Sequence, residues 1–68
     1  MQMTAILTSA PEGGYVAFNP ETGTTTQGES VEHALLNLRE ATELFLDEAP
    51  RSSLVKSFIT TFEVPAHA

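Results

Sequence analysis

The feature that most constrains this chain is a single amphipathic segment that begins after Ser30. Apolar residues recur there at steps of three and four, as they do along one face of an α-helix. These positions are Val31, Ala34, Leu35, Leu38, Ala41 and Phe45. The Ser30 hydroxyl can accept a hydrogen bond from a free amide of the first turn, and Pro50 disfavours helical backbone in the residue before it. The sequence therefore predicts one helix over residues 31–48 or 31–49, with one face against a sheet.

The residues before this helix carry three segments with β-strand character. Residues 3–9 have an apolar centre, residues 15–18 are rich in aromatic and β-branched side chains, and residues 24–27 hold a run of threonines. Turn signals separate them at 11–14 and 19–23, where proline and glycine occur together. The sequence predicts three successive strands, the first two joined as a β-hairpin and the third at an edge.

A fourth segment with alternating side chains follows the helix, over residues 57–64. One side of it would carry Phe58, Thr60, Phe62 and Val64, and the other Ile59, Thr61 and Glu63. We expect a last strand there, followed by a frayed C-terminal end at 65–68. The predicted fold class is α+β, in the order β-β-β-α-β, with a small antiparallel-rich sheet, one helix packed on one face, and residues 1–68 in a single domain.

A chain of 68 residues without cysteine has few ways to stabilise itself. At this length, apolar burial at roughly 25 cal/mol per Å² barely exceeds an ordering entropy of about 1.5 kcal/mol per residue. Disulfides and thiolate metal sites are excluded, so self-association is the expected reinforcement, with a marginally stable monomer as the alternative. A sheet covered by one helix leaves its other face open, and we expect Tyr15, Ala17 or Ile59 to form an oligomer interface there.

The charge of the chain restricts its partners. Nine acidic residues against three basic ones give a net charge of −6. Such a chain is repelled by phosphate backbones and anionic membrane surfaces, so we expect neither nucleic acid nor membrane as a direct partner. A basic protein is the complementary partner, and the alternative is that the charge only maintains solubility. The absence of cysteine, of a secretory signal and of a long apolar run predicts a cytoplasmic location.

The acidic residues of the predicted helix gather on its outward side. At 100° per residue, carboxylates surround Leu36, and Leu44 also lies off the apolar stripe. One exposed leucine needs no explanation, so a solvated face is the alternative to a contact surface. The candidate partner-binding residues are Glu32, Leu36, Glu40, Glu43, Leu44 and Asp47.

The sequence lacks the residue patterns of the common catalytic sites. Two-metal nucleases need several carboxylates from neighbouring strands, whereas the predicted strands contribute only Glu63. The pair Glu32-His33 has no second histidine at the zinc-binding spacing, and no serine lies in a nucleophile-elbow pattern. We therefore expect no enzymatic activity, no metal and no cofactor.

Three runs of the sequence carry a family resemblance: GYVAFNPETG at 14–23, TQGESVEHA at 26–34 and NLREATELFL at 37–46. Together they resemble the HicB-like antitoxin family, whose members show a strand with a YVA-like core, a Pro-acidic-x-x-Gly turn, a T-Q-G-acidic-Ser/Thr helix entry and an A-L-x-N-x-x-E-A helix. The match covers about residues 13–48, and the run TTFEV at 60–64 is similar too.

The resemblance implies a degenerate, partial RNase H-like domain without the nuclease carboxylates. It also implies a partner, a small basic HicA-type ribonuclease toxin that the antitoxin neutralises by covering it. It further implies that the chain assembles as a homodimer or homotetramer. Many members carry a C-terminal operator-binding domain, whereas this sequence ends at Ala68, so we expect no direct DNA binding. The alternative is a stand-alone homo-oligomeric structural or regulatory domain with no toxin partner.

Overall fold

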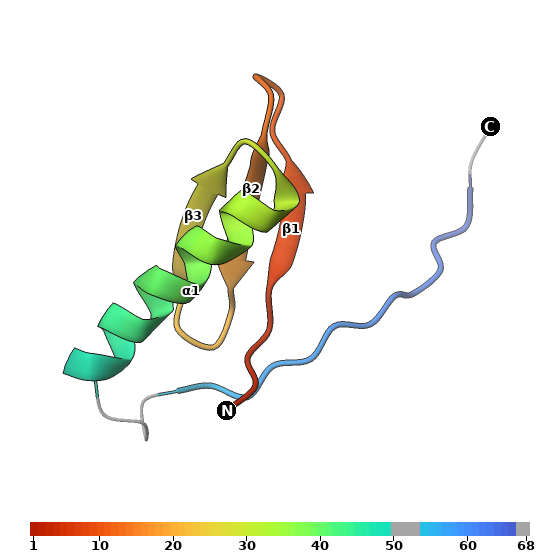
Figure 1. Cartoon of the computed structure of the whole chain (residues 1–68). Helices are drawn as coiled ribbons and strands as arrows, with labels where there is room; N and C mark the ends of the chain where they lie inside the picture. Colours follow the sequence, from red (N-terminus) through yellow and green to blue (C-terminus); the bar gives the residue numbers. More distant parts are fainter. Residues whose placement is uncertain (50–53, 67–68) are drawn as a thin grey trace.

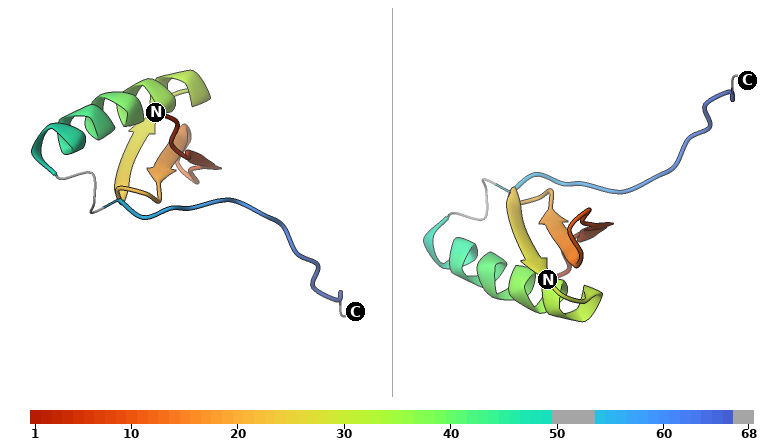
Figure 2. Two further views of the ribbon diagram at one scale, coloured as in Figure 1. Left: turned by 90° about the horizontal axis from the view of Figure 1, so that it is seen from below. Right: turned by 90° about the horizontal axis from the view of Figure 1, so that it is seen from above.

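The computed structural model describes residues 1–49 and 54–66. Three strands, β1 (Ile6–Ser9), β2 (Tyr15–Asn19) and β3 (Thr24–Gly28), precede one helix, α1 (Val31–Glu48). The strands form an antiparallel sheet in the order β1-β2-β3, and α1 covers one of its faces (Figures 1 and 2). The predicted α+β class, with a small antiparallel sheet and one helix on one face, is confirmed.

The turn between β1 and β2 depends on its two glycines. Gly13 and Gly14 have φ angles of 105° and 80°, a region that glycine enters without steric cost. The Gly13 N–H donates to the Ala10 carbonyl at 3.0 Å, and the Ala10 N–H donates to the Gly14 carbonyl at 3.0 Å. These bonds fix the register of the hairpin, in which Ser9 lies opposite Tyr15 and Ile6 opposite Phe18. The predicted hairpin is confirmed.

Both ends of α1 are set by the residues that the sequence indicated. At its start, the Ser30 side chain accepts a hydrogen bond from the His33 N–H at 3.1 Å. At its end, Ala49 has φ −106° and ψ 140°, the extended conformation expected of a residue that precedes proline. The predicted helix is confirmed, while Pro50 itself lies outside the described residues.

The core lies between the sheet and α1 and is small. Among the described residues, its buried hydrophobic side chains are Ala17, Ala34 and Leu38. A methyl group built on Gly28 would collide with the backbone of Ala34, so the end of β3 and the first turns of α1 are in direct backbone contact. The closeness of this contact explains why alanines, rather than larger residues, occupy the centre.

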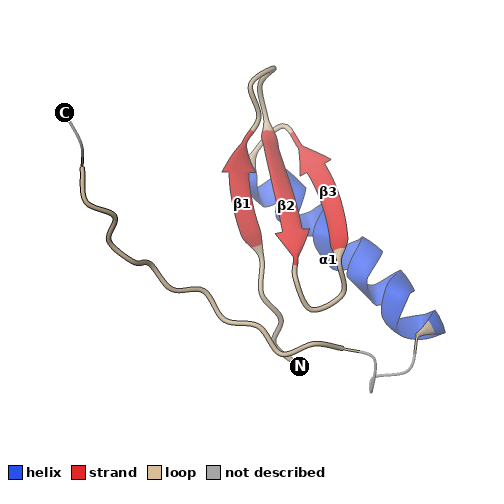
Figure 3. Ribbon diagram, turned by 180° about the vertical axis from the view of Figure 1, so that it is seen from behind, coloured by secondary structure: helices blue, strands red, loops and turns tan. Residues whose placement is uncertain are grey.

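The strand predicted over residues 57–64 is wrong for this structure. Residues 54–66 form no strand and run away from the sheet as an extended segment, which we call the tail (Figures 1 and 3). Phe58 is 87% exposed and Phe62 is 84% exposed. An alternating pattern favours extended backbone, but a strand also needs a neighbouring strand to pair with. Of the predicted frayed end at 65–68, residues 65–66 are exposed and residues 67–68 lie outside the described residues.

Candidate protein-binding surface

The structure places all six predicted partner-binding residues on the exposed side of α1. We call this set the outer helix face, and it comprises Glu32, Leu36, Glu40, Glu43, Leu44 and Asp47. The opposite side of the helix carries the buried residues Ala34, Leu38 and Thr42, which pack towards the sheet. The helix therefore separates a packed side from an acidic side, as its sequence pattern indicated.

Two leucines interrupt the carboxylates of the outer helix face. Leu36 is 53% exposed and Leu44 is 68% exposed. Leu36 lies one helical turn from both Glu32 and Glu40, since residues four apart are neighbours on a helix surface. The arrangement is an apolar centre with a charged surround, which is the usual composition of a protein contact surface.

Within the described residues, the outer helix face is only partly neutralised. Arg39 Nε lies 3.3 Å from Glu43 Oε1, so these two side chains form a salt bridge. Both side chains are mostly exposed, so the pair contributes about 0.3–0.5 kcal/mol. No basic residue lies in the last turn of α1, where Asp47 and Glu48 meet the negative end of the helix dipole. A cationic partner would therefore relieve repulsion mainly near this end.

The residues predicted for an oligomer interface do not gather on the open face of the sheet. Ala17 is fully buried beneath α1, Tyr15 packs against the same core, and Ile59 lies in the tail. The expected placement of Tyr15 and Ala17 is thus wrong. Residues 15–18 are apolar on both sides of the strand, so the sequence pattern did not decide which side faces the helix. The close approach of α1 favours the side that carries the small residue Ala17.

A buried polar contact, not foreseen from the sequence, joins the sheet to the helix. Asn19 Nδ2 donates to Thr42 Oγ1 at 3.3 Å and contacts Met3 Sδ at 3.6 Å, while Asn19 Oδ1 accepts from the Glu21 N–H at 2.9 Å. Asn19 is 1% exposed and Thr42 is 7% exposed. The sequence did contain a signal for this contact. Thr42 lies four positions after Leu38, on the same side of the helix, and Asn19 lies two positions after Ala17, on the same side of the strand.

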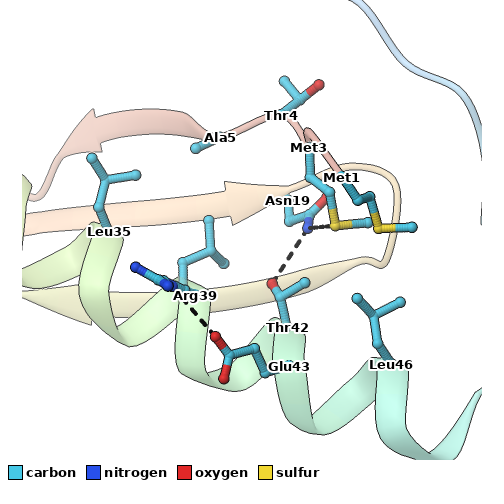
Figure 4. Close-up of a pocket in the computed structure, with 11 residues that line it drawn as sticks. Met1, Met3, Thr4, Ala5, Asn19, Leu35, Arg39, Thr42, Glu43 and Leu46 are labelled. Atoms are coloured by element: carbon cyan, nitrogen blue, oxygen red, sulfur yellow. Dashed lines mark hydrogen bonds and ion pairs between the residues drawn. The ribbon is translucent and has the colours of Figure 1, made fainter.

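An open groove of about 530 Å³ lies beside this contact, between the N-terminal segment (residues 1–5) and α1 (Figure 4). Met3 and Ala5 line it from one side, and Leu35 and Leu46 line it from the helix. Leu35 is 38% exposed although it belongs to the apolar stripe of the helix. The groove is therefore an incompletely covered part of the core. Beside its apolar residues, it is also lined by the polar side chains of Thr4, Asn19, Arg39, Thr42 and Glu43.

The described residues also bear on the expectations about metals and membranes. Within ranges 1–49 and 54–66, no cluster of three or more His, Cys, Asp or Glu side chains is arranged to hold a metal ion. His33 Nδ1 instead accepts from the Glu29 N–H at 3.4 Å, at the entry to α1. In the same part of the chain, no helix has the length and apolar character needed to cross a membrane.

Comparisons of this chain with protein-family models, with curated proteins and with solved structures find no match.

Proposed function

We propose that this chain is a protein-binding module of the HicB-like antitoxin type, which neutralises a small basic HicA-type ribonuclease toxin by covering it. The observation that carries the proposal is the outer helix face, where exposed carboxylates surround the exposed side chains of Leu36 and Leu44. Its charge is complementary to that of a basic ribonuclease, and its two leucines provide apolar contact area. The cysteine-free composition suits action in the cytoplasm.

The two kinds of residue on this face would act differently in binding. The leucines would be desolvated at the centre of the contact, where burial of their apolar surface would contribute affinity. The carboxylates at the rim would steer the basic partner and speed association, because opposite charges attract before contact. We therefore expect the complex to weaken as salt concentration rises. In this mechanism the chain binds and covers its partner, with no cofactor and no nucleic-acid contact of its own.

The proposal is tested by co-expressing the chain with the product of the neighbouring gene and asking whether a small basic protein copurifies. We expect the two to copurify, and the Glu40→Lys substitution on the outer helix face to weaken binding at least about tenfold. Glu12→Lys is the matched control, because Glu12 is an exposed carboxylate in the turn between β1 and β2 and does not belong to the outer helix face. The proposal fails if no small basic protein copurifies, or if both substitutions weaken binding equally.

The second candidate is a stand-alone homo-oligomeric structural or regulatory domain with no toxin. The observation that favours it is the open face of the sheet, where Ile6 and Phe18 lie opposite each other in register and are 37% and 36% exposed. Two such faces could bury each other between copies. Light scattering tests this candidate, and a strict monomer at high protein concentration would contradict it.

A further inference from the structure

We infer that residues 57–64 of one copy add as a strand to the outer edge of β1 in a second copy, so that two chains exchange their tails. Three independent features lead to this inference: the chemistry of the tail, the state of the two sheet edges, and the off-centre position of α1. It concerns a surface other than the outer helix face and does not depend on toxin binding.

The tail has the composition of a strand that packs on one face. Phe58 and Phe62 share one side of the extended backbone, with β-branched residues Ile59 and Thr61 on the other side. Exposed fractions of 87% for Phe58 and 84% for Phe62 leave both rings almost wholly in water. Burial of aromatic rings is a main source of affinity between proteins, so this side of the tail is suited to a binding partner.

The two edges of the sheet differ in whether their backbone N–H and C=O groups already make hydrogen bonds. Along β3, the Gln27 carbonyl accepts from Asn37 Nδ2 at 2.7 Å, and the Thr24 N–H donates to Thr22 Oγ1 at 3.2 Å. Along the outer edge of β1, no strand lies beside residues 6–9 in the described part of the chain (Figure 3). An edge strand presents N–H and C=O groups that can pair with an added strand. β1 is therefore the edge that receives one.

The position of α1 leaves room for the side chains of an added strand. The helix packs on β3 and β2, so the space above β1 is filled only in part. The groove lined by Ala5, Leu35 and Leu46 lies beside the start of β1 (Figure 4). A strand beside β1 would place the helix over the middle of a four-stranded sheet, with Phe58 and Phe62 directed into the groove. Residues 57–64 span about 26 Å when extended, which is enough to run past β1 and Ala5.

The direction of the tail identifies the partner as a second copy of the chain. The Val55 N–H donates to the Glu21 carbonyl at 3.4 Å, which anchors the start of the tail at the turn between β2 and β3. From this point the tail runs away from its own sheet in all views (Figures 1, 2 and 3). A second copy related by a two-fold axis presents the same β1 edge and offers its own tail in return, which closes the assembly as a dimer.

Sedimentation equilibrium of the full chain over a range of concentrations tests this inference. We expect a dimer, and we expect the double substitution Phe58→Ser and Phe62→Ser to raise its dissociation constant at least about tenfold. Leu44→Ser is the matched control, because Leu44 is an exposed apolar residue on the outer helix face and should leave the dimer intact. An excess of a synthetic peptide with the sequence of residues 54–66 should also dissociate the dimer, whereas a peptide of scrambled sequence should not.

The salt dependence separates this inference from toxin binding. Each copy carries a net charge of −6, so added salt should screen repulsion and strengthen the dimer, while it should weaken a complex with a basic toxin. A chain that remains monomeric at all concentrations overturns the inference. This holds also if the tail of the monomer folds back on its own β1. A dimer that the two serine substitutions leave unchanged also overturns it, because the contact then lies elsewhere.

Discussion

Asn19 connects three parts of the molecule that are distant in sequence. Its amide side chain bonds Thr42 of α1 and the backbone of Glu21, and it contacts Met3 of the N-terminal segment. A buried polar group that loses its partner retains the full cost of its desolvation. This asparagine therefore determines how the helix is aligned on the sheet more strictly than the apolar contacts around it, since dispersion forces have little directionality.

Removing the hydroxyl of Thr42 tests that role. We expect Thr42→Val to lower the free energy of unfolding by about 1–3 kcal/mol, because Asn19 Nδ2 then loses an acceptor inside the core. Thr25→Val is the matched control, since Thr25 lies exposed on β3, and it should change stability by less than about 0.5 kcal/mol. Urea unfolding followed by circular dichroism measures both. Equal effects of the two substitutions would show that the buried hydrogen bond is unimportant.

Glu21 makes the stability of the fold depend on acid pH. The Thr4 side chain donates to its carboxylate, and the Thr4 N–H donates to it at 2.8 Å. These bonds, the side-chain bond first, lower the pKa of Glu21 below its ordinary value of 4.5, against a smaller opposing effect of burial. Because the folded pKa is the lower one, the stabilisation is present above pH 4.5 and is lost as the pH falls through the folded pKa.

We expect Glu21→Gln to flatten the loss of stability on the acid side of pH 4.5. Thr4→Val should flatten it partly, because the backbone donor of Thr4 remains. Thr8→Val, a change at an exposed position of β1, should retain the full dependence on pH. Urea midpoints at a series of acidic pH values measure these differences. An unchanged acid dependence in Glu21→Gln would contradict the role of this carboxylate.

The helix was predictable from the sequence because its signals are local. The Ser30 cap, the apolar spacing after it and the proline at 50 all act within one or two turns, and α1 begins and ends where they indicate. The facing of β2 was not predictable, because residues on both of its sides are apolar. Which side is buried depends on how closely α1 approaches, and that distance is set by Gly28 and Ala34 at another point of the chain.

The last strand was not predictable for a related reason. Residues 57–64 carry the alternating pattern of a strand, yet the tail pairs with no strand in the described structure. A periodic pattern reports what kind of surface a segment can pack on, and it contains no information about whether that surface belongs to the same chain. The six residues of the outer helix face were predictable in position, since helical periodicity alone separates them from the packed side.

Two leucines on opposite sides of α1 allow a matched test of the helix. Leu38 is 4% exposed and Leu36 is 53% exposed. We expect Leu38→Ala to lower the free energy of unfolding by about 2–5 kcal/mol, which is most of the stability of so small a domain. Leu36→Ala should lower it by less than about 0.5 kcal/mol. Thermal and urea unfolding measure both, and similar losses would contradict the assignment of the two helix sides.

At the scale of the whole molecule, the small core leaves little apolar burial to stabilise a single copy. Only three hydrophobic side chains are buried within residues 1–49 and 54–66, while Phe58 and Phe62 remain exposed in the tail. Anything that binds the folded state and not the unfolded state raises the apparent stability. Exchange of tails between copies would do so, because it adds apolar burial that one chain lacks.

The thermal midpoint should therefore rise with protein concentration. For a dimer that unfolds to monomers, each tenfold rise in concentration contributes about 1.4 kcal/mol per mole of dimer. Differential scanning calorimetry over about a hundredfold range of concentration measures the effect. The chain with Phe58→Ser and Phe62→Ser should show a much smaller dependence. A midpoint that is the same at all concentrations for the unsubstituted chain would show that the single copy is the stable unit.

The close approach of β3 and α1 at Gly28 affects how this protein can vary during evolution. Position 28 has no room for a methyl group, so a substitution there displaces the helix and its whole packed side. The outward positions of the same helix, such as Leu36 and Leu44, are more than half exposed and lie outside the core. Substitutions can accumulate there without loss of structure. The outward surface of α1 can therefore diverge quickly among descendants of this chain while the scaffold that carries it remains fixed.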